Sequence, residues 1–417
     1  MTPLIRKLWR SQPAWLRRQE MRLITRLMAR PLDPRRAILA GEVLVGGFFG
    51  TASGLGEAAR HMLRTFQANG IAAQAVNVSR FAVMEDFEAG PLWPETTTAG
   101  GIAVFHVNPD ILNLVLGAIG RHRLNKRRIV GCWYWELETI PRKWRHTLRC
   151  VDEVWAPSRF IADAIGKALP GKPVYVMSLP VNRDVPTTPR HDPLPQFAGR
   201  PLVLFAFDVR STVARKNPAA VVEAFRRATV NNPDAVLVLK ANCEAAWPPA
   251  REYLENIVGG APNIHIMREV LSGDGMRDLV ARADVVMSLH RSEGFGLLMA
   301  EAMLAAKPVI ATGWSSNLDF MTPECSVLVD YKLVPVKDPQ NIYNRYGARW
   351  AEADVDQAAA ALRRLLEDPA ERQRMGQAAR AHAMQHFSPE NWLRSLPQSF
   401  WDSLPDGGAE AKRRLGF

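Results

Sequence analysis

The sequence predicts an α/β protein built from two doubly wound parallel sheets. Three observations predict this fold class. Short apolar runs alternate with segments of helical periodicity from residue 37 onward, a proline-rich stretch interrupts this alternation, and the same alternation then restarts. The chain has 417 residues, which at roughly 100–200 residues per domain suggests two or three domains.

The first half of the alternation predicts six strands and four helices. The expected strands cover residues 42–48, 72–78, 101–106, 128–133, 153–156 and 174–177. The expected helices cover residues 56–69, 108–116, 141–150 and 159–169. The prolines that follow, from Pro180 to Pro201, are typical of a linker between domains.

The second half repeats the pattern. Its expected strands cover residues 202–207, 235–240, 264–267, 285–289, 309–312 and 326–329, and its expected helices cover residues 218–228, 252–257, 276–283, 297–305 and 354–366. We therefore expect domains at residues 37–195 and 196–387, with a ligand cleft between the ends of their sheets. Residues 388–404 are rich in tryptophan, leucine and phenylalanine, so this tail must pack on another part of the chain.

Composition excludes several classes of protein. Hydrophobic residues make up 47% of the chain and charged residues 23%, which are ordinary globular values. No run of about 18 apolar residues exists, and the N-terminus lacks the apolar core of a secretory signal. The four cysteines have no CxxC spacing, so we expect neither a disulfide framework nor a zinc site. A cytoplasmic protein fits these features.

The net charge of +11 is concentrated at the N-terminus. Residues 1–36 contain ten basic side chains and two acidic ones, and the rest of the chain is near neutral. We therefore expect no nucleic-acid binding by the folded domains. Residues 4–30 interleave arginines with leucine and tryptophan, as in an amphipathic helix on an anionic membrane surface. The alternative is a helix that packs on the body with a solvated basic face.

The densest chemical signal lies at residues 290–317. A Gly-Phe-Gly turn at residues 294–296 separates an expected strand from an expected helix, and helix N-termini bind phosphate. Glu293 precedes the turn, and Glu301 lies about one helical turn beyond it. Carboxylates accept hydrogen bonds from vicinal hydroxyls, so two of them beside a phosphate site suit a sugar nucleotide. The alternative for Glu301 alone is an ordinary surface glutamate.

Glu293 and Glu301, followed by Lys307-Pro308-Val309, resemble the E-x7-E signature of retaining glycosyltransferases of the family-4 type. The resemblance spans residues 40–400 and implies a GT-B fold, in which two Rossmann-like domains face each other across a cleft. It implies that the C-terminal helix crosses back, so that residues 388–417 complete the first, acceptor-binding domain. Glu293 would contact the donor sugar and Glu301 the ribose. The resemblance implies further donor contacts from Gly294, Phe295, Gly296 and Leu297.

A basic loop follows the first strand of the second half. Lys216, Arg215 and Arg210 are placed to bind a diphosphate and to offset the charge of a leaving group. The family often has an arginine five residues before the lysine, whereas this chain has Ser211 there. We rank Lys216 first, Arg215 second and Arg210 third. The alternative is that these three side chains are ordinary solvated charges of a surface loop.

The first half carries candidates at the ends of its expected strands. Gly54 and Gly56 lie in a glycine-rich loop that resembles the family's N-terminal loop, although a structural turn is the alternative. His106 ends a strand and resembles the family histidine beside the transferred sugar, or it caps the next helix.

Three more residues are candidates for binding the acceptor. Glu136 could accept hydrogen bonds from acceptor hydroxyls, and Trp135 could stack on a sugar face or pack in the core. Ser158 fits the cleft floor and a helix N-cap equally well.

Two other patterns suggest chemistry that we reject. Asp354 and Asp356 have the spelling of a metal-binding DxD motif, but they begin an alanine-rich helix, where acidic side chains are favoured. Glu293 and Glu301 could form a glycosidase pair, but eight helical residues would separate them by about 12 Å, more than hydrolysis requires.

The sequence therefore predicts a retaining, metal-independent glycosyltransferase without a cofactor. It would move a hexose-type sugar from a nucleotide diphosphate donor to a hydroxyl acceptor, such as a lipid-linked glycan at the inner face of a bacterial plasma membrane. Synthesis of cell-envelope polysaccharide or glycolipid is the expected setting. The alternatives are a GT-B sugar-nucleotide epimerase and a non-catalytic protein that binds sugar nucleotides.

Overall fold

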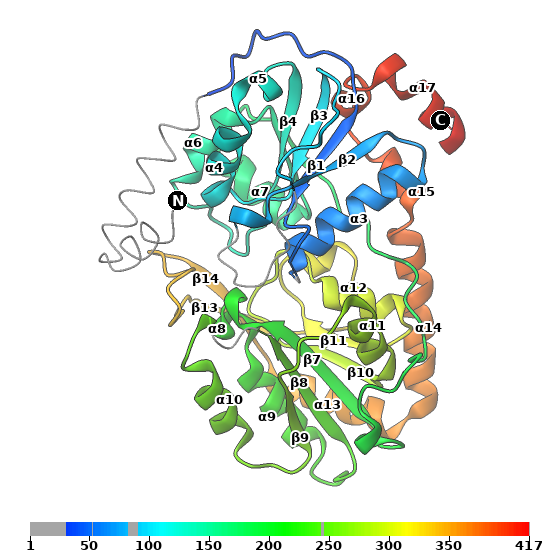
Figure 1. Cartoon of the computed structure of the whole chain (residues 1–417). Helices are drawn as coiled ribbons and strands as arrows, with labels where there is room; N and C mark the ends of the chain where they lie inside the picture. Colours follow the sequence, from blue (N-terminus) through cyan, green and yellow to red (C-terminus); the bar gives the residue numbers. More distant parts are fainter. Residues whose placement is uncertain (1–30, 52, 82–90, 243–245, 417) are drawn as a thin grey trace.

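The structure is a computed structural model that describes residues 31–51, 53–81, 91–242 and 246–416. It contains two domains, each built on a six-stranded parallel sheet with helices on both faces (Figure 1). The fold class predicted from the sequence is confirmed. Burial explains why the strands could be recognised in the sequence, because β1 (Val43–Gly47) and β3 (Gly101–Phe105) are buried along their whole length. Such strands read as continuous apolar runs.

The first sheet has the strand order β2-β1-β3-β4-β5-β6. Its other strands are β2 (Ala73–Asn77), β4 (Arg127–Cys132), β5 (Glu153–Ala156) and β6 (Val174–Val176). Its helices are α3 (Gly54–Ala68), α4 (Pro109–Ile119), α5 (Arg121–Leu124), α6 (Trp144–Thr147) and α7 (Arg159–Ala168).

The second sheet has the order β12-β11-β10-β7-β8-β9. Its strands are β7 (Leu202–Asp208), β8 (Val236–Asn242), β9 (Ile264–Met267), β10 (Val285–Ser288), β11 (Val309–Thr312) and β12 (Val327–Val329). The surrounding helices are α8 (Val213–Lys216), α9 (Pro218–Ala228), α10 (Ala250–Val258), α11 (Gly273–Arg282), α12 (Leu297–Leu304) and α13 (Val355–Glu367). Every strand expected from the sequence is therefore confirmed.

The sequence analysis missed a hairpin and a long helix that follow the second sheet. The antiparallel hairpin of β13 (Tyr331–Pro335) and β14 (Arg349–Ala353) follows the second sheet, and α14 (Pro369–His386) follows α13. The hairpin is hard to recognise because its first strand is largely exposed and lacks a clean apolar run. The helix is hard to recognise because only three of its residues are buried, and all of them are small.

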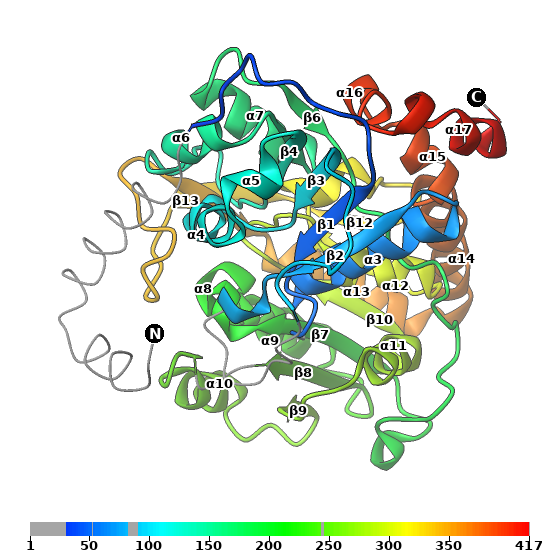
Figure 2. The ribbon, with the colours of Figure 1, turned by 45° about the horizontal axis from the view of Figure 1, so that its top comes forward.

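The C-terminal segment returns to the first domain, as the resemblance implied. After α14 the chain forms α15 (Pro389–Arg394), α16 (Gln398–Trp401) and α17 (Ala409–Leu415), and Figure 2 shows α15 beside α3. Trp392 donates from Nε1 to the carbonyl of Ser178 at 2.6 Å. Phe400 stacks on Phe66 of α3, with ring centroids 5.3 Å apart. The apolar tail therefore completes the core of the first domain.

The rejected metal motif starts a helix, as expected. Asp354 is the N-cap of α13, and its carboxylate accepts a hydrogen bond from the backbone N–H of Gln357 at 3.0 Å. Asp356 pairs with Arg227 at 2.5 Å. Within the described ranges, no group of three or more His, Cys, Asp or Glu side chains could hold a metal ion.

The N-terminal segment lies mostly outside the described residues, so its amphipathic character stays a prediction. Residues 31–36 are described and lie against the first domain. There Arg36 pairs with Asp152 at 2.5 Å, so its charge is neutralised by the body of the protein. Among the residues that the structure describes, no helix is long and apolar enough to cross a membrane.

The returning tail gives a first prediction. Phe400 is fully buried against Phe66 and Trp155, so Phe400→Ala should lower the free energy of unfolding of the first domain by about 3–5 kcal/mol. Val230→Ala, at a side chain that is 76% exposed, should change stability by less than about 0.5 kcal/mol. Urea unfolding followed by tryptophan fluorescence measures both. Equal stability of the two variants would mean that the tail does not contribute to the core.

Candidate functional site

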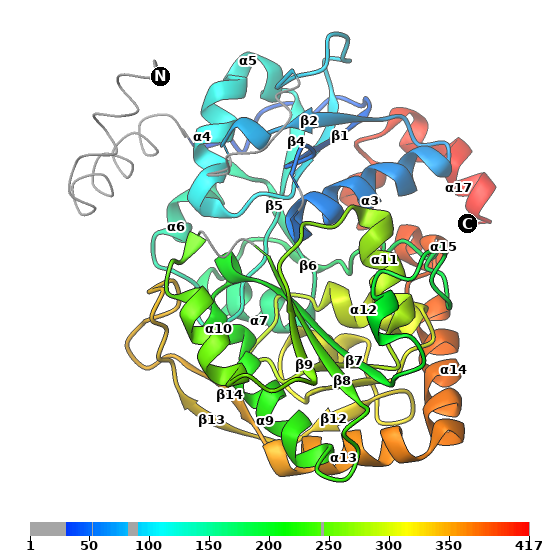
Figure 3. The same ribbon diagram turned by 60° about the horizontal axis from the view of Figure 1, so that its bottom comes forward.

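The candidate site lies where loops after the strands of the two sheets meet. Two hydrogen bonds join the start of α7 in the first domain to residues 316–319 of the second domain. Ser158 and Ser316 share a hydrogen bond of 2.7 Å between their hydroxyl oxygens, and the backbone N–H of Arg159 donates to Asp319 at 2.6 Å. Figure 3 shows α3 of the first domain next to α11 and α12 of the second. The two domains are therefore in direct contact around the site.

A strained loop carries the two leading basic residues. Arg215 and Lys216 belong to the single turn of α8, which is bracketed by Thr212 and Asn217. These two residues have φ angles of 62° and 58°, which non-glycine residues rarely adopt. Gln340 holds the loop because its side chain accepts from the N–H of Val213 and donates to the carbonyl of Val209. Strain of this kind persists only where the surroundings hold it, and it gathers at functional sites.

Glu293 lies between the two basic side chains. Its carboxylate accepts a hydrogen bond from Nζ of Lys216 and lies 3.4 Å from Nη1 of Arg215. Its backbone N–H donates to Oγ of Ser315 at 2.8 Å. Burial alone would raise the pKa of Glu293, but the charges of Lys216 and Arg215 outweigh it and lower this pKa to about 2. Glu293 is therefore ionised at neutral pH.

Arg215 is fixed more firmly than Lys216. Its guanidinium donates from Nη1 to the carbonyl of Ser292 at 2.6 Å and from Nε to the carbonyl of Ser211 at 3.0 Å. Burial opposes its charge, but the carboxylate of Glu293 reverses that effect and raises the pKa of Arg215. Together with Lys216 it forms a fixed pair of cations in a nearly dry setting. Such a pair can bind and stabilise an anionic group.

The two glycines of the Gly-Phe-Gly turn are each required for a different structural reason. Gly296 has a φ of 100°, which a side chain would strain, and it is the N-cap of α12. A Cβ at Gly294 would lie 3.1 Å from Oε1 of Glu136, so this glycine allows the Glu136 carboxylate to approach the turn. Phe295 packs in the core against Phe320, with ring centroids 5.4 Å apart. Leu297 begins α12.

The carboxylate of Glu301 does not take part in the ion cluster, which consists of Glu293, Lys216 and Arg215. Among the described residues, its carboxylate has no hydrogen-bond partner, and it faces Glu57 of α3 and Arg277 of α11. Burial and then the charge of Glu57 raise the pKa of Glu301 to about 7, while the charge of Arg277 acts in the opposite direction. A carboxyl group without a partner at a domain junction is available to a ligand.

Two predicted residues are placed away from the cluster. His106 is fully buried at the end of β3, where its ring contacts the Tyr134 hydroxyl at 3.0 Å and the Met62 sulfur at 3.2 Å. Burial lowers the pKa of His106 to about 3, so the ring is neutral. Arg210 turns back onto Asp208 and bonds both carboxylate oxygens. The structure thus brings together Glu293, Lys216 and Arg215, but not His106 or Arg210.

The acceptor candidates take different positions. Glu136 lies at the cluster, with Oε1 3.9 Å from Arg215. Trp135 is only 5% exposed, donates to the carbonyl of Thr139 and packs on Trp144, so its ring belongs to the core. Ser158 is the N-cap of α7, which was one of its two suggested positions, and its buried hydroxyl shares a hydrogen bond with Ser316 of the second domain.

The two loop glycines begin α3. A Cβ at Gly56 would lie 2.7 Å from the carbonyl of Phe48, so this position must be a glycine for the loop to close. Its N–H donates to the Ser53 hydroxyl, which caps the helix. Gly54 has open space around it, and no packing contact requires a glycine there.

Sequence reasoning missed Tyr343, whose hydroxyl donates to Oε2 of Glu136 at 2.7 Å. It also missed Ser315 and Gln340, which hold the backbones of the Glu293 and Arg215 loops. Tyr343 and Gln340 belong to no recognisable motif, and Ser315 lies within residues 290–317 but was not singled out there. Tyr343 and Glu136 are 207 positions apart in the sequence, so spacing could not reveal the contact.

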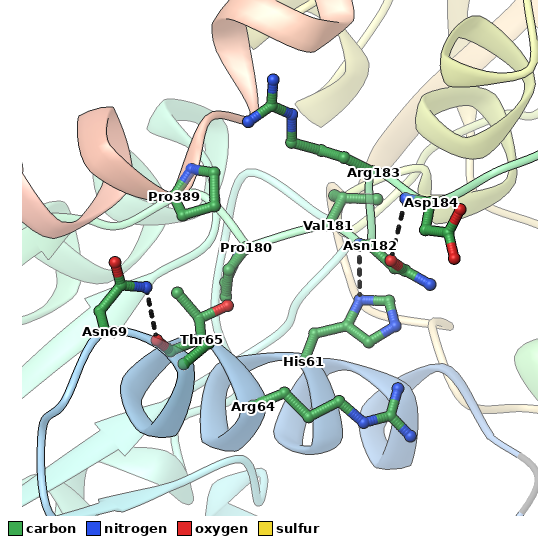
Figure 4. Close-up of a pocket in the computed structure, with 11 residues that line it drawn as sticks. His61, Arg64, Thr65, Asn69, Pro180, Val181, Asn182, Arg183, Asp184 and Pro389 are labelled. Carbon is green, nitrogen blue, oxygen red and sulfur yellow. Dashed lines mark hydrogen bonds between the residues drawn. The ribbon is translucent and has the colours of Figure 1, made fainter.

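A separate cavity of about 300 Å³ lies between α3, the linker and the start of α15 (Figure 4). His61 of α3 accepts a hydrogen bond from the backbone N–H of Asn182 at 3.2 Å. Arg64, Arg183 and Pro389 also line the cavity. This contact ties the linker to the first domain.

Comparison with known proteins agrees with this architecture. Residues 200–368 match the family described as "Glycosyl transferases group 1". A trehalose synthase from Rubrobacter xylanophilus is 26% identical over 185 residues, which cover 43% of this chain and 39% of that protein. An MMP alpha-(1->4)-mannosyltransferase from Mycolicibacterium hassiacum is 31% identical over 120 residues, covering 28% and 24%. The aligned part thus spans less than two fifths of these curated relatives.

Solved structures extend the likeness to both domains. Anabaena Alr3699/HepE in complex with UDP-glucose matches with a TM-score of 0.60 and 13% identity, covering 85% of this chain and 97% of that one. A glycosyltransferase from Rickettsia africae matches with a TM-score of 0.59 and 14% identity, covering 92% and 99%. The fold is GT-B. In this GT-B chain, the ion cluster and α12 both belong to the second domain, within the segment that matches the family.

Glu301 gives the second prediction. Because its pKa is raised from an ordinary 4.5 to about 7, the folded state binds this proton more tightly, and stability falls as pH rises from about 4.5 to 7. Glu301→Gln removes this penalty, so it should stabilise the protein by about 3 kcal/mol at pH 8 and by less than about 1 kcal/mol at pH 5. Urea unfolding at both pH values measures it. The control is the exposed Glu367→Gln, and a Glu301→Gln effect independent of pH would contradict the raised pKa.

Proposed function

We propose that this protein is a retaining glycosyltransferase of the family-4 type, which moves a hexose-type sugar from a nucleotide diphosphate donor to a hydroxyl acceptor without a metal ion. The observation that carries the proposal is the cluster of Glu293, Lys216 and Arg215 beside the glycine turn that begins α12. The printed names of the relatives, which include a mannosyltransferase and a trehalose synthase, support the same class of chemistry.

The cations and the helix would bind the donor diphosphate. Lys216 and Arg215 belong to α8, and backbone N–H groups at the start of α12 would add further hydrogen-bond donors to the same anion. As the bond between sugar and phosphate breaks, negative charge grows on the leaving diphosphate. Fixed cations in a dry site stabilise that charge without reorganisation, so no metal ion is needed for this step.

Glu293 would change partners when the donor binds. In the described structure its carboxylate offsets the charges of Lys216 and Arg215. A diphosphate would take over those cations, and the Glu293 carboxylate could then accept hydrogen bonds from hydroxyls of the donor sugar. Glu301 would bind the ribose diol, and Glu136 would accept a hydrogen bond from the acceptor hydroxyl.

Turnover by a lysine variant tests the proposal. With a panel of uridine, guanosine and adenosine diphosphate sugars, Lys216→Ala should lower kcat by about 10²–10³ because the developing charge loses one fixed cation. Lys332→Ala, at an exposed lysine of β13, should keep the activity of the parent protein. Activity of the parent should persist in excess EDTA.

The products separate the alternatives. Transfer with retained anomeric configuration, detected by NMR of the product, supports the proposal. Isomerised sugar nucleotide would identify an epimerase, and binding without any product would identify a non-catalytic protein. Loss of activity in EDTA, restored by Mg²⁺ or Mn²⁺, would contradict the metal-independent mechanism.

We further propose that the N-terminal segment attaches the enzyme to an anionic membrane, where a lipid-linked acceptor would be found. Residues 1–30 contain eight basic side chains and one acidic one, and each basic residue near such a surface contributes about 1 kcal/mol. The full chain should sediment with phosphatidylglycerol vesicles at low salt and be released at high salt. A chain of residues 31–417 keeps the pair of Arg36 and Asp152 and should not sediment. Equal sedimentation of both would contradict this attachment.

A further inference from the structure

A loop of the second domain reaches the first domain beside the ion cluster. Residues 336–348 connect β13 to β14, and Figure 1 shows this hairpin at the junction of the two domains. Asp338 holds the loop because its buried carboxylate accepts hydrogen bonds from the backbone N–H groups of Gln340, Ile342 and Tyr343 at 2.8–3.1 Å. The loop is therefore an organised structure that presents Tyr343 in a fixed direction.

Tyr343 makes contacts with both domains. Its hydroxyl donates to Oε2 of Glu136 at 2.7 Å, and its ring packs on Trp135 with centroids 5.3 Å apart. The guanidinium of Arg215 lies over the same ring at 5.8 Å. Burial and the charge of Glu136 raise the pKa of Tyr343 well above its usual 10, so the phenol stays protonated and remains a donor.

The hydrogen bond from Tyr343 makes the two carboxylate oxygens of Glu136 different from each other. Oε2 is occupied by the phenol, whereas Oε1 lies over Gly294 and 3.9 Å from Nη2 of Arg215, beyond hydrogen-bond distance. The Glu136 side chain is 15% exposed, so a ligand can reach it. The arrangement keeps one carboxylate oxygen beside the turn that would hold the donor.

We infer that Tyr343 is a positioning residue that holds Glu136 ready to bind the acceptor hydroxyl. This inference rests on the proposed function, because it concerns the acceptor side of the same site. Without the phenol, Glu136 is free to rotate toward Arg215 and to accept a hydrogen bond from Nη2, which lies 3.9 Å from Oε1. Such a contact would remove the acceptor's hydrogen-bond partner.

The experiment compares two fates of the donor sugar. With a nucleotide sugar that the parent enzyme uses and a panel of methyl hexosides as acceptors, the ratio of transfer to hydrolysis is measured. Tyr343→Phe keeps the ring and its packing but removes the hydroxyl, so this ratio should fall about tenfold, as for loss of a hydrogen bond to a charged group. The loss should appear in the KM for the acceptor rather than in the KM for the donor.

Tyr346→Phe is the matched control. Tyr346 lies on the same loop, but its side chain is fully exposed, so the ratio should not change. Because Tyr343 acts through Glu136, Glu136→Gln should itself lower the ratio, and adding Tyr343→Phe to that variant should change it by less than about twofold.

The outcomes separate the two proposals. A parent protein that transfers sugar to no acceptor overturns both the proposed function and this inference. A parent that transfers sugar, but whose Tyr343 and Glu136 variants have multiplicative effects, overturns the inference alone. If Tyr343→Phe raised the KM for the donor as much as the KM for the acceptor, the inference would also be overturned, because equal increases indicate a structural defect.

Discussion

The site depends on one buried electrostatic interaction, in which Glu293 lies between Lys216 and Arg215. Removing three charged groups from water costs several kcal/mol per ion, and the cost is recovered only if the geometry and the remaining hydrogen bonds are good. The surrounding loops meet this condition. Ser315 holds the backbone of Glu293, and the carbonyls of Ser211 and Ser292 accept from the guanidinium of Arg215. Much of the local architecture can be understood as support for this cluster.

The backbone around the cluster shows how tightly it is held. Thr212, Asn217 and Ser315 all have positive φ angles, which cost of order 1–3 kcal/mol each. They persist because side chains from distant segments fix them, such as the side chain of Gln340 on the loop before α8. The hairpin of β13 and β14 is therefore part of the site, since its loop supplies both Gln340 and Tyr343. The parallel sheets supply the strand ends, and the hairpin fixes the loops that extend from them.

The sequence predicted the sheets well because their inner strands are largely buried and read as continuous apolar runs. It also singled out Glu293 and Lys216, which follow the neighbouring strands β10 and β7, but not the ion pair between them. The direction of a side chain at a strand end is harder to predict. His106 lies at the expected strand end, but packing turns its ring into the core against Met62 and Tyr134. Contacts such as that of Tyr343 with Glu136 depend on tertiary structure and have no local signal.

A buried ion cluster is weak evidence for stability, because apolar side chains of similar size often serve as well. Its retention at a domain junction therefore needs another reason. Glu293 and Glu136 together balance the charges of Lys216 and Arg215 in the described structure. An anionic ligand that binds the cations would release Glu293 toward neutral hydroxyl groups, while Glu136 keeps its hydrogen bond from Tyr343. This exchange of partners would prepare the donor side of the site, and the phenol of Tyr343 would limit how closely Glu136 approaches Arg215 on the acceptor side.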